Sequence, residues 1–255
     1  MKTYLFFASM CITLTSIMHA ESFDSFEQAL VAPEKATTLS IKKYDPAIKH
    51  LPSQLGTLIN LVELDISCLE TLEDLPSEMG NLKKLEKLII DNGNSCQMNI
   101  SLPESIGDLS NLKVLRLYGA IDRETPPSKV KSLPGTIGKL QNLEVLDLGR
   151  NGIKGIPSQI ASLQKLKRLA LDYNEIHELP AFVGNLKNLQ ELSVCANGGI
   201  KLPKSLSNLN ELKIFMGNNH LKIKDQEKLR GLFPKATFSF ENEYDDSAAN
   251  EETPE

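Results

Sequence analysis

The chain has 255 residues, of which 41% are apolar and only 5% aromatic, with no Trp, so any core has to be built from aliphatic side chains. The formal charge is -5, but the last fifteen residues carry seven carboxylates and no Lys or Arg. Without that segment the acidic excess disappears and no basic stripe remains to neutralise phosphates, which argues against a nucleic-acid-binding protein.

The first twenty residues have the pattern of a secretory signal peptide. Lys2 precedes an uncharged apolar stretch over residues 4–18, and Ala20 stands ahead of Glu21. The stretch is short for a membrane span, which needs roughly 20 predominantly apolar residues. We therefore expect residues 1–20 to be removed, leaving a mature chain from Glu21 with no stable membrane span, in a secreted, cell-surface or periplasmic location. An uncleaved hydrophobic anchor and a cytoplasmic location are the alternatives.

Residues 21–50 are expected to form an N-terminal cap with a half repeat. The spacing of the apolar side chains over residues 22–33 predicts an amphipathic helix. The L-x-I pair at Leu39 and Ile41 then has the alternation of a strand. A capping unit of this kind protects the first coil of a repeat protein from solvent.

About seven repeats occupy residues 51–221. Leu-Pro, once Ile-Pro, recurs in steps of 24, 27, 31, 23, 23 and 23 residues, at Leu51, Leu75, Leu102, Leu133, Ile156, Leu179 and Leu202. Leucines follow seven, ten and thirteen places on, with Phe215 as the last of them in the final unit. The aligned unit, LPxxIGxLxxLxxLxLxxNxIxx, gives each repeat one strand through its L-x-L pair and a short helical or 3₁₀ segment that begins at the Pro. A period of this length predicts a solenoid whose coils stack their leucines into one column.

The repeat position just after the strand favours Asn. Its side-chain amide can hydrogen-bond to backbone groups of the turn, which have no partner in a regular strand ladder. This position is occupied by Asn151, Asn174 and Asn197 in three repeats, and by Leu69, Gly93 and Ala120 in the preceding ones. We therefore expect a regular half over residues 133–202 and a looser half before it. Residues 120–132, with a Pro-Pro pair and mixed charge, should bulge out as a loop.

Residues 222–240 are expected to form a C-terminal cap. Residues 225–233 have the composition of a helix, with Asp225 as its N-cap and Pro234 just beyond its end, and residues 236–240 alternate as a strand. Residues 241–255 lack a periodic apolar set and are expected to be an acidic disordered tail.

The repeat unit, the export signal and the opening EQALVAPEKATTLSI together resemble the exported bacterial leucine-rich repeat proteins, of the type found in spirochaetes. Similar units occur in cytosolic Ras-binding scaffolds and in plant receptors. The resemblance implies an α/β fold, namely a leucine-rich repeat solenoid shaped as a curved horseshoe. Its parallel strands would line the concave face, with short helices or 3₁₀ turns on the convex face. The resemblance also implies recognition of other proteins, often at a host or cell surface.

A partner would bind the outward residues of the strands, since packing fixes the inward ones. The expected outward rows are Glu63 and Asp65; Lys87, Ile89 and Asp91; Val114, Arg116 and Tyr118; Val145 and Asp147; Arg168, Ala170 and Asp172; Glu191, Ser193 and Cys195; Ile214, Met216 and Asn218. Arg and Tyr are typical interface anchors. We therefore predict a partner-binding cluster of neighbouring residues on consecutive coils, made of Arg116, Tyr118, Asp147, Arg168, Asp172 and Tyr173. Ordinary solvated strand residues are the competing interpretation.

No catalytic, cofactor or metal site is predicted. The sequence has no phosphate-cradling glycine loop, no GxSxG and no metal-ligand spacing. Adjacent coils could bring Cys68 and Cys96 together, and both a disulfide and two free thiols are compatible with the sequence. Cys195 has no nearby base to activate it, which favours a small filler over a reactive thiol.

These observations together predict an exported, monomeric, non-catalytic module that binds a protein, with a glycan as the less favoured ligand, on the face formed by its strands. The alternative is an intracellular leucine-rich repeat scaffold or effector that regulates a signalling protein. The recognition arm of an enzyme such as a ubiquitin ligase is the least favoured interpretation.

Overall fold

A computed structural model describes residues 20–42, 48–67, 69, 71–91, 100–119 and 133–240. Four expectations fall outside these ranges and stay predictions. They concern the signal peptide up to residue 19, the pair Cys68 and Cys96, the loop over residues 120–132 and the acidic tail over residues 241–255.

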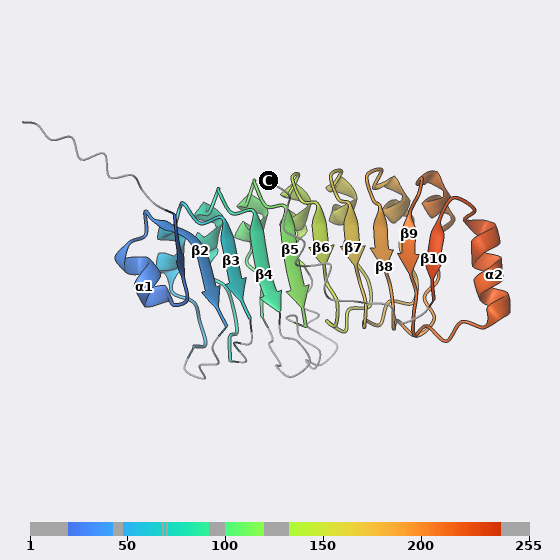
Figure 1. The fold of residues 1–255 in the computed structure, drawn as a ribbon, viewed down its shortest axis with the longest axis horizontal. Coiled ribbons are helices and arrows are strands. Elements are labelled where there is room, and N and C mark those ends of the chain that lie inside the picture. Colours follow the sequence, from blue (N-terminus) through green and yellow to red (C-terminus); the bar gives the residue numbers. More distant parts are fainter. Residues whose placement is uncertain are drawn as a thin grey trace, which may run out of the picture.

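The described residues form ten parallel strands in one open sheet, in chain order from β1 to β10. The strands are β1 (Glu21–Phe23), β2 (Ala36–Ile41), β3 (Glu63–Ile66), β4 (Lys87–Asp91), β5 (Val114–Tyr118), β6 (Val145–Asp147), β7 (Arg168–Ala170), β8 (Glu191–Ser193), β9 (Lys213–Phe215) and β10 (Thr237–Ser239). Figure 1 shows them side by side, with the helix α1 (Phe26–Val31) at one end and α2 (Ile223–Leu232) at the other. This architecture is the leucine-rich repeat solenoid that the sequence predicts.

Seven 3₁₀ turns form the other layer of the described solenoid, one in each coil. They are η1 (Ser53–Thr57), η2 (Ser77–Asn81), η3 (Glu104–Asp108), η4 (Gly135–Lys139), η5 (Ser158–Ser162), η6 (Ala181–Asn185) and η7 (Lys204–Asn208). Each turn follows the proline of its repeat, as at Pro134, where φ is -61° and the carbonyl accepts a hydrogen bond from the Ile137 N–H at 3.0 Å. Because proline has no N–H to leave unpaired and its φ is already fixed, it suits this entry point.

The core is a column of aliphatic side chains between the two layers. Neighbouring strands pair leucine with leucine in register, and these leucines have no exposed surface: Leu64, Leu88, Leu115, Leu146, Leu169 and Leu192. Burying such a side chain stabilises a fold by about 1.5 to 3 kcal/mol. No coil could enclose its own leucines, so the stack is the folding unit.

Glycines in the 3₁₀ turns set how closely the coils approach. A Cβ placed on Gly107 would lie 2.4 Å from the Thr136 carbonyl oxygen of the next coil, and one on Gly184 would lie 2.3 Å from that of Ser205. Both distances are far inside van der Waals contact. Glycine at these positions therefore lets the turns pack closely, because a larger residue would push them apart. Ala161 in η5 and Ser207 in η7 take its place in two of the coils.

Buried asparagines hydrogen-bond to the backbone of the turns that follow β6 to β9. The Asn174 side-chain oxygen accepts hydrogen bonds from the N–H groups of Asn151 and Ile153 at 3.0 and 3.1 Å, and its amide group donates to the carbonyls of Leu148 and Leu171, both at 2.9 Å. Four asparagines form this ladder, namely Asn151, Asn174, Asn197 and Asn219. Asn219 was not among the predicted members.

The final repeat is one residue shorter than expected, which corrects the predicted register of its strand. Ile214 and Met216 are buried, each with 1% of its surface exposed, and Lys213 and Phe215 face outward instead. Ile214 pairs in register with Leu192. The spacing of leucines alone predicts that Phe215 points inward. The pairing of β9 with β8 instead places Ile214 beside the inward Leu192.

The two ends differ from the predicted caps in detail. A strand, β1, occupies residues 21–23, so the helix expected over residues 22–33 is shortened to α1, with Ser25 as its N-cap accepting from the Gln28 N–H at 3.3 Å. At the other end α2 begins at Ile223, so Asp225 lies in its first turn, where its charge favours the helix dipole, and is not the N-cap.

Candidate partner-binding face

The outward side chains of β2 to β10 form one continuous surface, here named the strand face. Strand register arranges it in rows that run across the coils. The first row is Thr38, Glu63, Lys87, Val114, Val145, Arg168, Glu191, Lys213 and Thr237; the second is Ser40, Asp65, Ile89, Arg116, Asp147, Ala170, Ser193, Phe215 and Ser239.

Arg116 lies at the centre of an ion-pair network on this face. Its Nε is 3.1 Å from Asp147 Oδ2 on the adjacent strand, and its Nη1 is 3.8 Å from Asp91 Oδ2 on the strand before it. Only 21% of the Arg116 side chain is exposed. The guanidinium is therefore held in one orientation by carboxylates on both sides.

Tyr118 packs against the backbone of the following coil. A Cβ on Gly149 would lie 2.7 Å from two carbons of the Tyr118 ring, so only glycine fits beneath the ring. The Gly149 N–H donates to Asp147 Oδ1 at 2.9 Å, and its carbonyl accepts from the Gly119 N–H at 2.9 Å. Tyr118 and the Arg116–Asp147 pair are thus joined through Gly149.

Asp147 is 4% exposed although it lies on an outward row. Burial raises its carboxyl pKa above the ordinary value, and this effect outweighs the opposing hydrogen bond from Gly149 and the charge of Arg116. The Arg168 charge also lowers it, which places Arg168 within electrostatic range of the same carboxylate.

Asp172 belongs to a neighbouring buried cluster. Its Oδ1 accepts from Ser193 Oγ at 2.6 Å and from the Cys195 N–H at 2.7 Å. Burial raises the Asp172 pKa, and the negative charge of Asp147 adds to the rise. Burial followed by the Asp172 charge raises the pKa of the Cys195 thiol to about 11, so the thiol is protonated at neutral pH and is a poor nucleophile.

Tyr173 lies in the turn after β7 and not on the strand itself. Its backbone is left-handed, with φ of 54°, and 46% of its surface is exposed. Its N–H donates to the Cys195 carbonyl at 2.9 Å. Of the six predicted residues, the structure therefore joins Arg116, Asp147 and Tyr118 directly, places Arg168 near them, puts Asp172 in the adjacent cluster and leaves Tyr173 at the edge.

A half-buried aliphatic strip runs through the middle of the strand face. Ile89, Val114 and Val145 supply it from β4, β5 and β6, and their side chains are neither fully buried nor fully exposed. In the first row, ion pairs lie on either side of this strip. Lys87 pairs with Glu63 at 3.1 Å on one side, and Lys213 pairs with Glu191 at 3.7 Å on the other. The sequence places these three residues in the outward rows, but the predicted partner-binding cluster does not include them.

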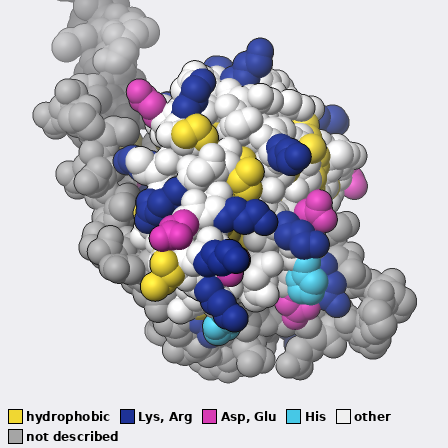
Figure 2. Space-filling model, turned by 90° about the vertical axis from the view of Figure 1, so that its right-hand side faces the viewer, with side chains coloured by type: hydrophobic (Ala, Val, Ile, Leu, Met, Phe, Trp, Pro, Cys, Tyr) yellow, Lys and Arg dark blue, Asp and Glu magenta, His cyan; other side chains and the backbone are white. Residues whose placement is uncertain are grey.

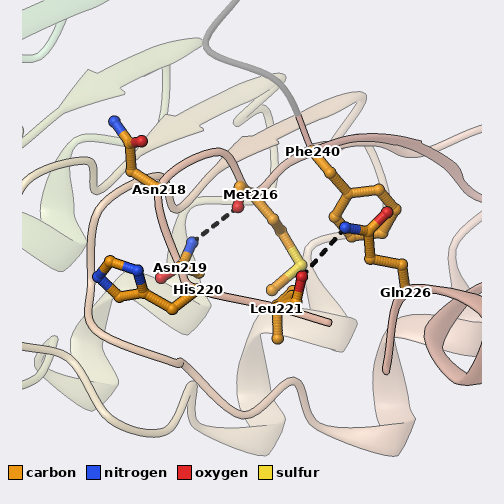
Figure 3. Close-up of a pocket in the computed structure, with 7 residues that line it drawn as sticks. All are labelled: Met216, Asn218, Asn219, His220, Leu221, Gln226 and Phe240. Atoms are coloured by element: carbon orange, nitrogen blue, oxygen red, sulfur yellow. Dashed lines mark hydrogen bonds between the residues drawn. The ribbon is translucent and has the colours of Figure 1, made fainter. Parts of the chain in front are cut away.

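A small, partly open pocket of about 230 Å³ lies away from this cluster, at the C-terminal end (Figure 3). It is lined by Met216, Asn218, Asn219, His220, Leu221, Gln226 and Phe240. Two of its polar groups already bond to the backbone: Asn219 Nδ2 donates to the Met216 carbonyl at 3.0 Å and Gln226 Nε2 to that of Leu221 at 3.2 Å. Such a pocket is smaller than the 300 to 1,000 Å³ or so that is typical of small-molecule sites.

Within the described ranges, no three His, Cys, Asp or Glu side chains are grouped so that they could hold a metal ion. In the same part of the chain, no helix has both the length and the apolar character that crossing a membrane requires.

Comparison with known proteins agrees with this geometry. The family described as leucine-rich repeat region matches residues 123–232. The leucine-rich repeat ectodomain of the plant membrane receptor kinase GASSHO1/SCHENGEN3 from Arabidopsis thaliana, solved in complex with CASPARIAN STRIP INTEGRITY FACTOR 2, is 28% identical with a TM-score of 0.54. The match covers 77% of this chain and 23% of the ectodomain.

Two further matches are more distant or shorter. An internalin of Listeria monocytogenes is 19% identical with a TM-score of 0.49, over 87% of this chain and 72% of its own. A probable serine/threonine-protein kinase of Dictyostelium discoideum, pats1, is 42% identical over 67 residues, which is 26% of this chain and 2% of the kinase. The chain thus spans only a small fraction of the kinase and of the plant ectodomain. Repeats of this kind generally serve as non-catalytic scaffolds for protein interaction.

Proposed function

We propose that this protein is an exported, monomeric recognition module that binds a protein ligand on the strand face between β4 and β8 and has no catalytic role. The observation that carries the proposal is the fixed arrangement around Arg116, in which paired charges and the Tyr118 ring border the aliphatic strip of Ile89, Val114 and Val145.

This arrangement has the chemistry of a protein interface. Interfaces combine an apolar centre with a polar rim and are enriched in Arg and Tyr. Side chains that are already held by neighbours lose little conformational freedom on docking, so less of the binding free energy is consumed by ordering them. The Arabidopsis ectodomain, whose structure was solved in complex with another factor, supports ligand binding by a similar repeat array.

The strand face can be tested by capture of a ligand with the full chain. A variant carrying Arg116→Ala, Tyr118→Ala and Arg168→Ala should lose the ligand, and a control with Lys49→Ala, Lys139→Ala and Lys187→Ala, which changes exposed side chains away from the strand face, should keep it. Undiminished capture by the first variant would refute the proposal.

Arg116→Ala leaves the buried Asp147 without its pair and can destabilise the fold, so a milder variant is needed. Arg168→Ala with Tyr173→Asn removes two accessible groups, and Asn tolerates the left-handed backbone at residue 173. Ligand affinity should fall while the chain stays folded, as measured by circular dichroism. Equal affinity with an intact fold would place the site elsewhere.

Export is the second part of the proposal and rests on residues 1–20. The charged start, the short apolar stretch and the small residue at Ala20 support removal of this segment, and together with the repeat type they support a bacterial exported protein. N-terminal sequencing of the protein from extracellular or periplasmic fractions should find Glu21 as the first residue. A chain that keeps Met1 and stays in the cytoplasm would favour an intracellular scaffold.

A further inference from the structure

The C-terminal end of the solenoid has an excess of positive charge. Five exposed cations gather there, namely Lys222, Lys224, Lys228, Arg230 and Lys235, against two carboxylates, Asp225 and Glu227, which leaves three net positive charges (five minus two) over residues 220–240. Figure 2 shows Lys and Arg side chains gathered on this face of the molecule. We name these five residues and the helix α2 the basic end.

Several cations along the body of the solenoid form ion pairs with carboxylates on adjacent coils, and none of the five cations of the basic end does so among the described residues. Lys113 lies 2.8 Å from Glu86, and Lys167 lies 2.7 Å from Glu144, each on an adjacent coil. Among the residues that the structure describes, no carboxylate lies within 4.0 Å of any cation of the basic end. The nearest partners of two of them are uncharged: Lys235 Nζ donates to Asn210 Oδ1 at 3.0 Å, and Arg230 covers the Phe240 ring at 5.1 Å.

The outer side of α2 is also uncovered by the described residues. No residue of the helix is buried, and 75% of the Ile223 surface and 48% of the Leu232 surface are exposed. An unpaired basic surface beside exposed aliphatic side chains favours an acidic segment as its occupant.

The acidic segment of residues 241–255 starts at this surface. It follows Phe240 directly, the residue that Arg230 covers, and it carries seven carboxylates and no Lys or Arg. We propose that residues 241–255 dock across the basic end of the same chain and neutralise it. Fifteen residues reach up to about 50 Å when extended, whereas α2 is about 15 Å long, so every cation of the basic end is within reach.

Attachment at Phe240 favours this segment over a second copy or another anion. A tethered segment is presented at an effective concentration on the order of 1 mM, so even weak attraction fills the surface. The contact depends on exposed charges, which salt screens over about 8 Å at physiological ionic strength. It should therefore weaken steeply as salt is added.

Nuclear magnetic resonance on the full chain tests the contact. The comparison is between the wild type and a full-length variant whose seven carboxylates in residues 241–255 are replaced by amides, Glu→Gln and Asp→Asn. The amide resonances of Lys224 and Lys228, which are far in sequence from the changes, should shift between the two chains. A synthetic peptide of residues 241–255 added to the amide variant should move them back toward the wild-type positions, and about 0.5 M salt should abolish the difference.

A matched pair of charge reversals separates docking from net charge. Lys224→Glu with Lys228→Glu should abolish binding of the peptide, whereas Lys49→Glu with Lys139→Glu, an equal change of charge away from the basic end, should leave it intact. Identical α2 resonances in the wild type and the amide variant at low salt would overturn the proposal. A shift that fades on about tenfold dilution would also overturn it, because the segment would then be docking on a second copy.

Discussion

The coils on either side of residues 120–132 are built on the same core but end their strands differently. In the earlier coils the strands β3, β4 and β5 run for four or five residues, and Leu69, fully buried, takes the place after the first of them. In the later coils β6 to β9 have three residues each and are followed by a left-handed residue and a buried Asn. Leucine therefore sets the stacking in both sets of coils, with glycine in most of the 3₁₀ turns, whereas the asparagine ladder fixes where each of the later strands gives way to its turn.

The largest expected effect comes from breaking the ladder. Asn174→Ala removes the side-chain partner of three backbone groups, the N–H groups of Asn151 and Ile153 and the carbonyl of Leu148, whereas the Leu171 carbonyl keeps the Asn197 amide at 2.9 Å. Since each buried group left unsatisfied costs about 1 kcal/mol or more, the free energy of unfolding should fall by at least ~3 kcal/mol. Urea denaturation measures it.

Asn111→Ala provides the matched control in the earlier coils. Its side chain is exposed and makes one bond, to the Lys83 carbonyl at 2.7 Å, so the loss should stay below about 1 kcal/mol. Equal losses from the two substitutions would mean that the ladder contributes nothing special to the later coils.

Glycine substitutions should affect both sets of coils alike. Gly107→Ala and Gly184→Ala each place a Cβ within 2.4 Å of a carbonyl oxygen of the next coil, so each should destabilise by about 1 to 3 kcal/mol. Gly155→Ala, where no atom lies within 4 Å of the added Cβ, should be close to neutral. A large loss at only one of Gly107 and Gly184 would contradict a common stacking rule.

Stability should depend on pH through the buried carboxylates of the later coils. Because burial raises the Asp172 pKa above its unfolded value of about 3.8, the folded state binds the proton more tightly, and stability from this group is lost as pH rises through the folded pKa. Asp172→Asn keeps an oxygen to accept from Ser193 and Cys195 but carries no charge. Relative to wild type, it should therefore become more stable as pH is raised from about 4 toward 7.

Urea denaturation across that pH range is the measurement. A difference between Asp172→Asn and wild type that stays constant across this range would show that the Asp172 carboxylate has the same pKa in the folded and unfolded chains.

The smallest expected change in stability comes from the turns that contain the asparagine ladder. Ala196 has a left-handed backbone, with φ of 51°, which costs a non-glycine residue about 1 to 2 kcal/mol. Ala196→Gly removes that cost but adds freedom to the unfolded chain, so a net gain of about 0.5 kcal/mol is expected. Ala181→Gly, in a 3₁₀ turn, should destabilise slightly, and the two thermal shifts should have opposite signs.

The sequence predicts the repetitive part of this molecule well. The period, the L-x-L strands and the 3₁₀ segments after each proline follow from spacing alone, because the same contacts recur in every coil. The proximity of Arg116 to Asp147 follows from the same alignment, since it places both residues at one position of neighbouring repeats.

Features that depend on one particular neighbour were not predictable in this way. Period-two alternation marks Asp147 as a solvent-facing residue, yet the fold encloses it between Arg116 and the backbone of Gly149. The inward position of Ile214 is decided only by pairing with β8. In both cases the deciding contact comes from another coil, and the local pattern does not contain it.

Hydrogen exchange of the full chain, alone and with its captured protein ligand, tests the binding role of the strand face most directly. The amides of β4 to β8 and of the turns that follow them should exchange more slowly in the complex, while those of η1 to η7 should be unchanged. Protection confined to the 3₁₀ turns or to either end of the solenoid would contradict the account.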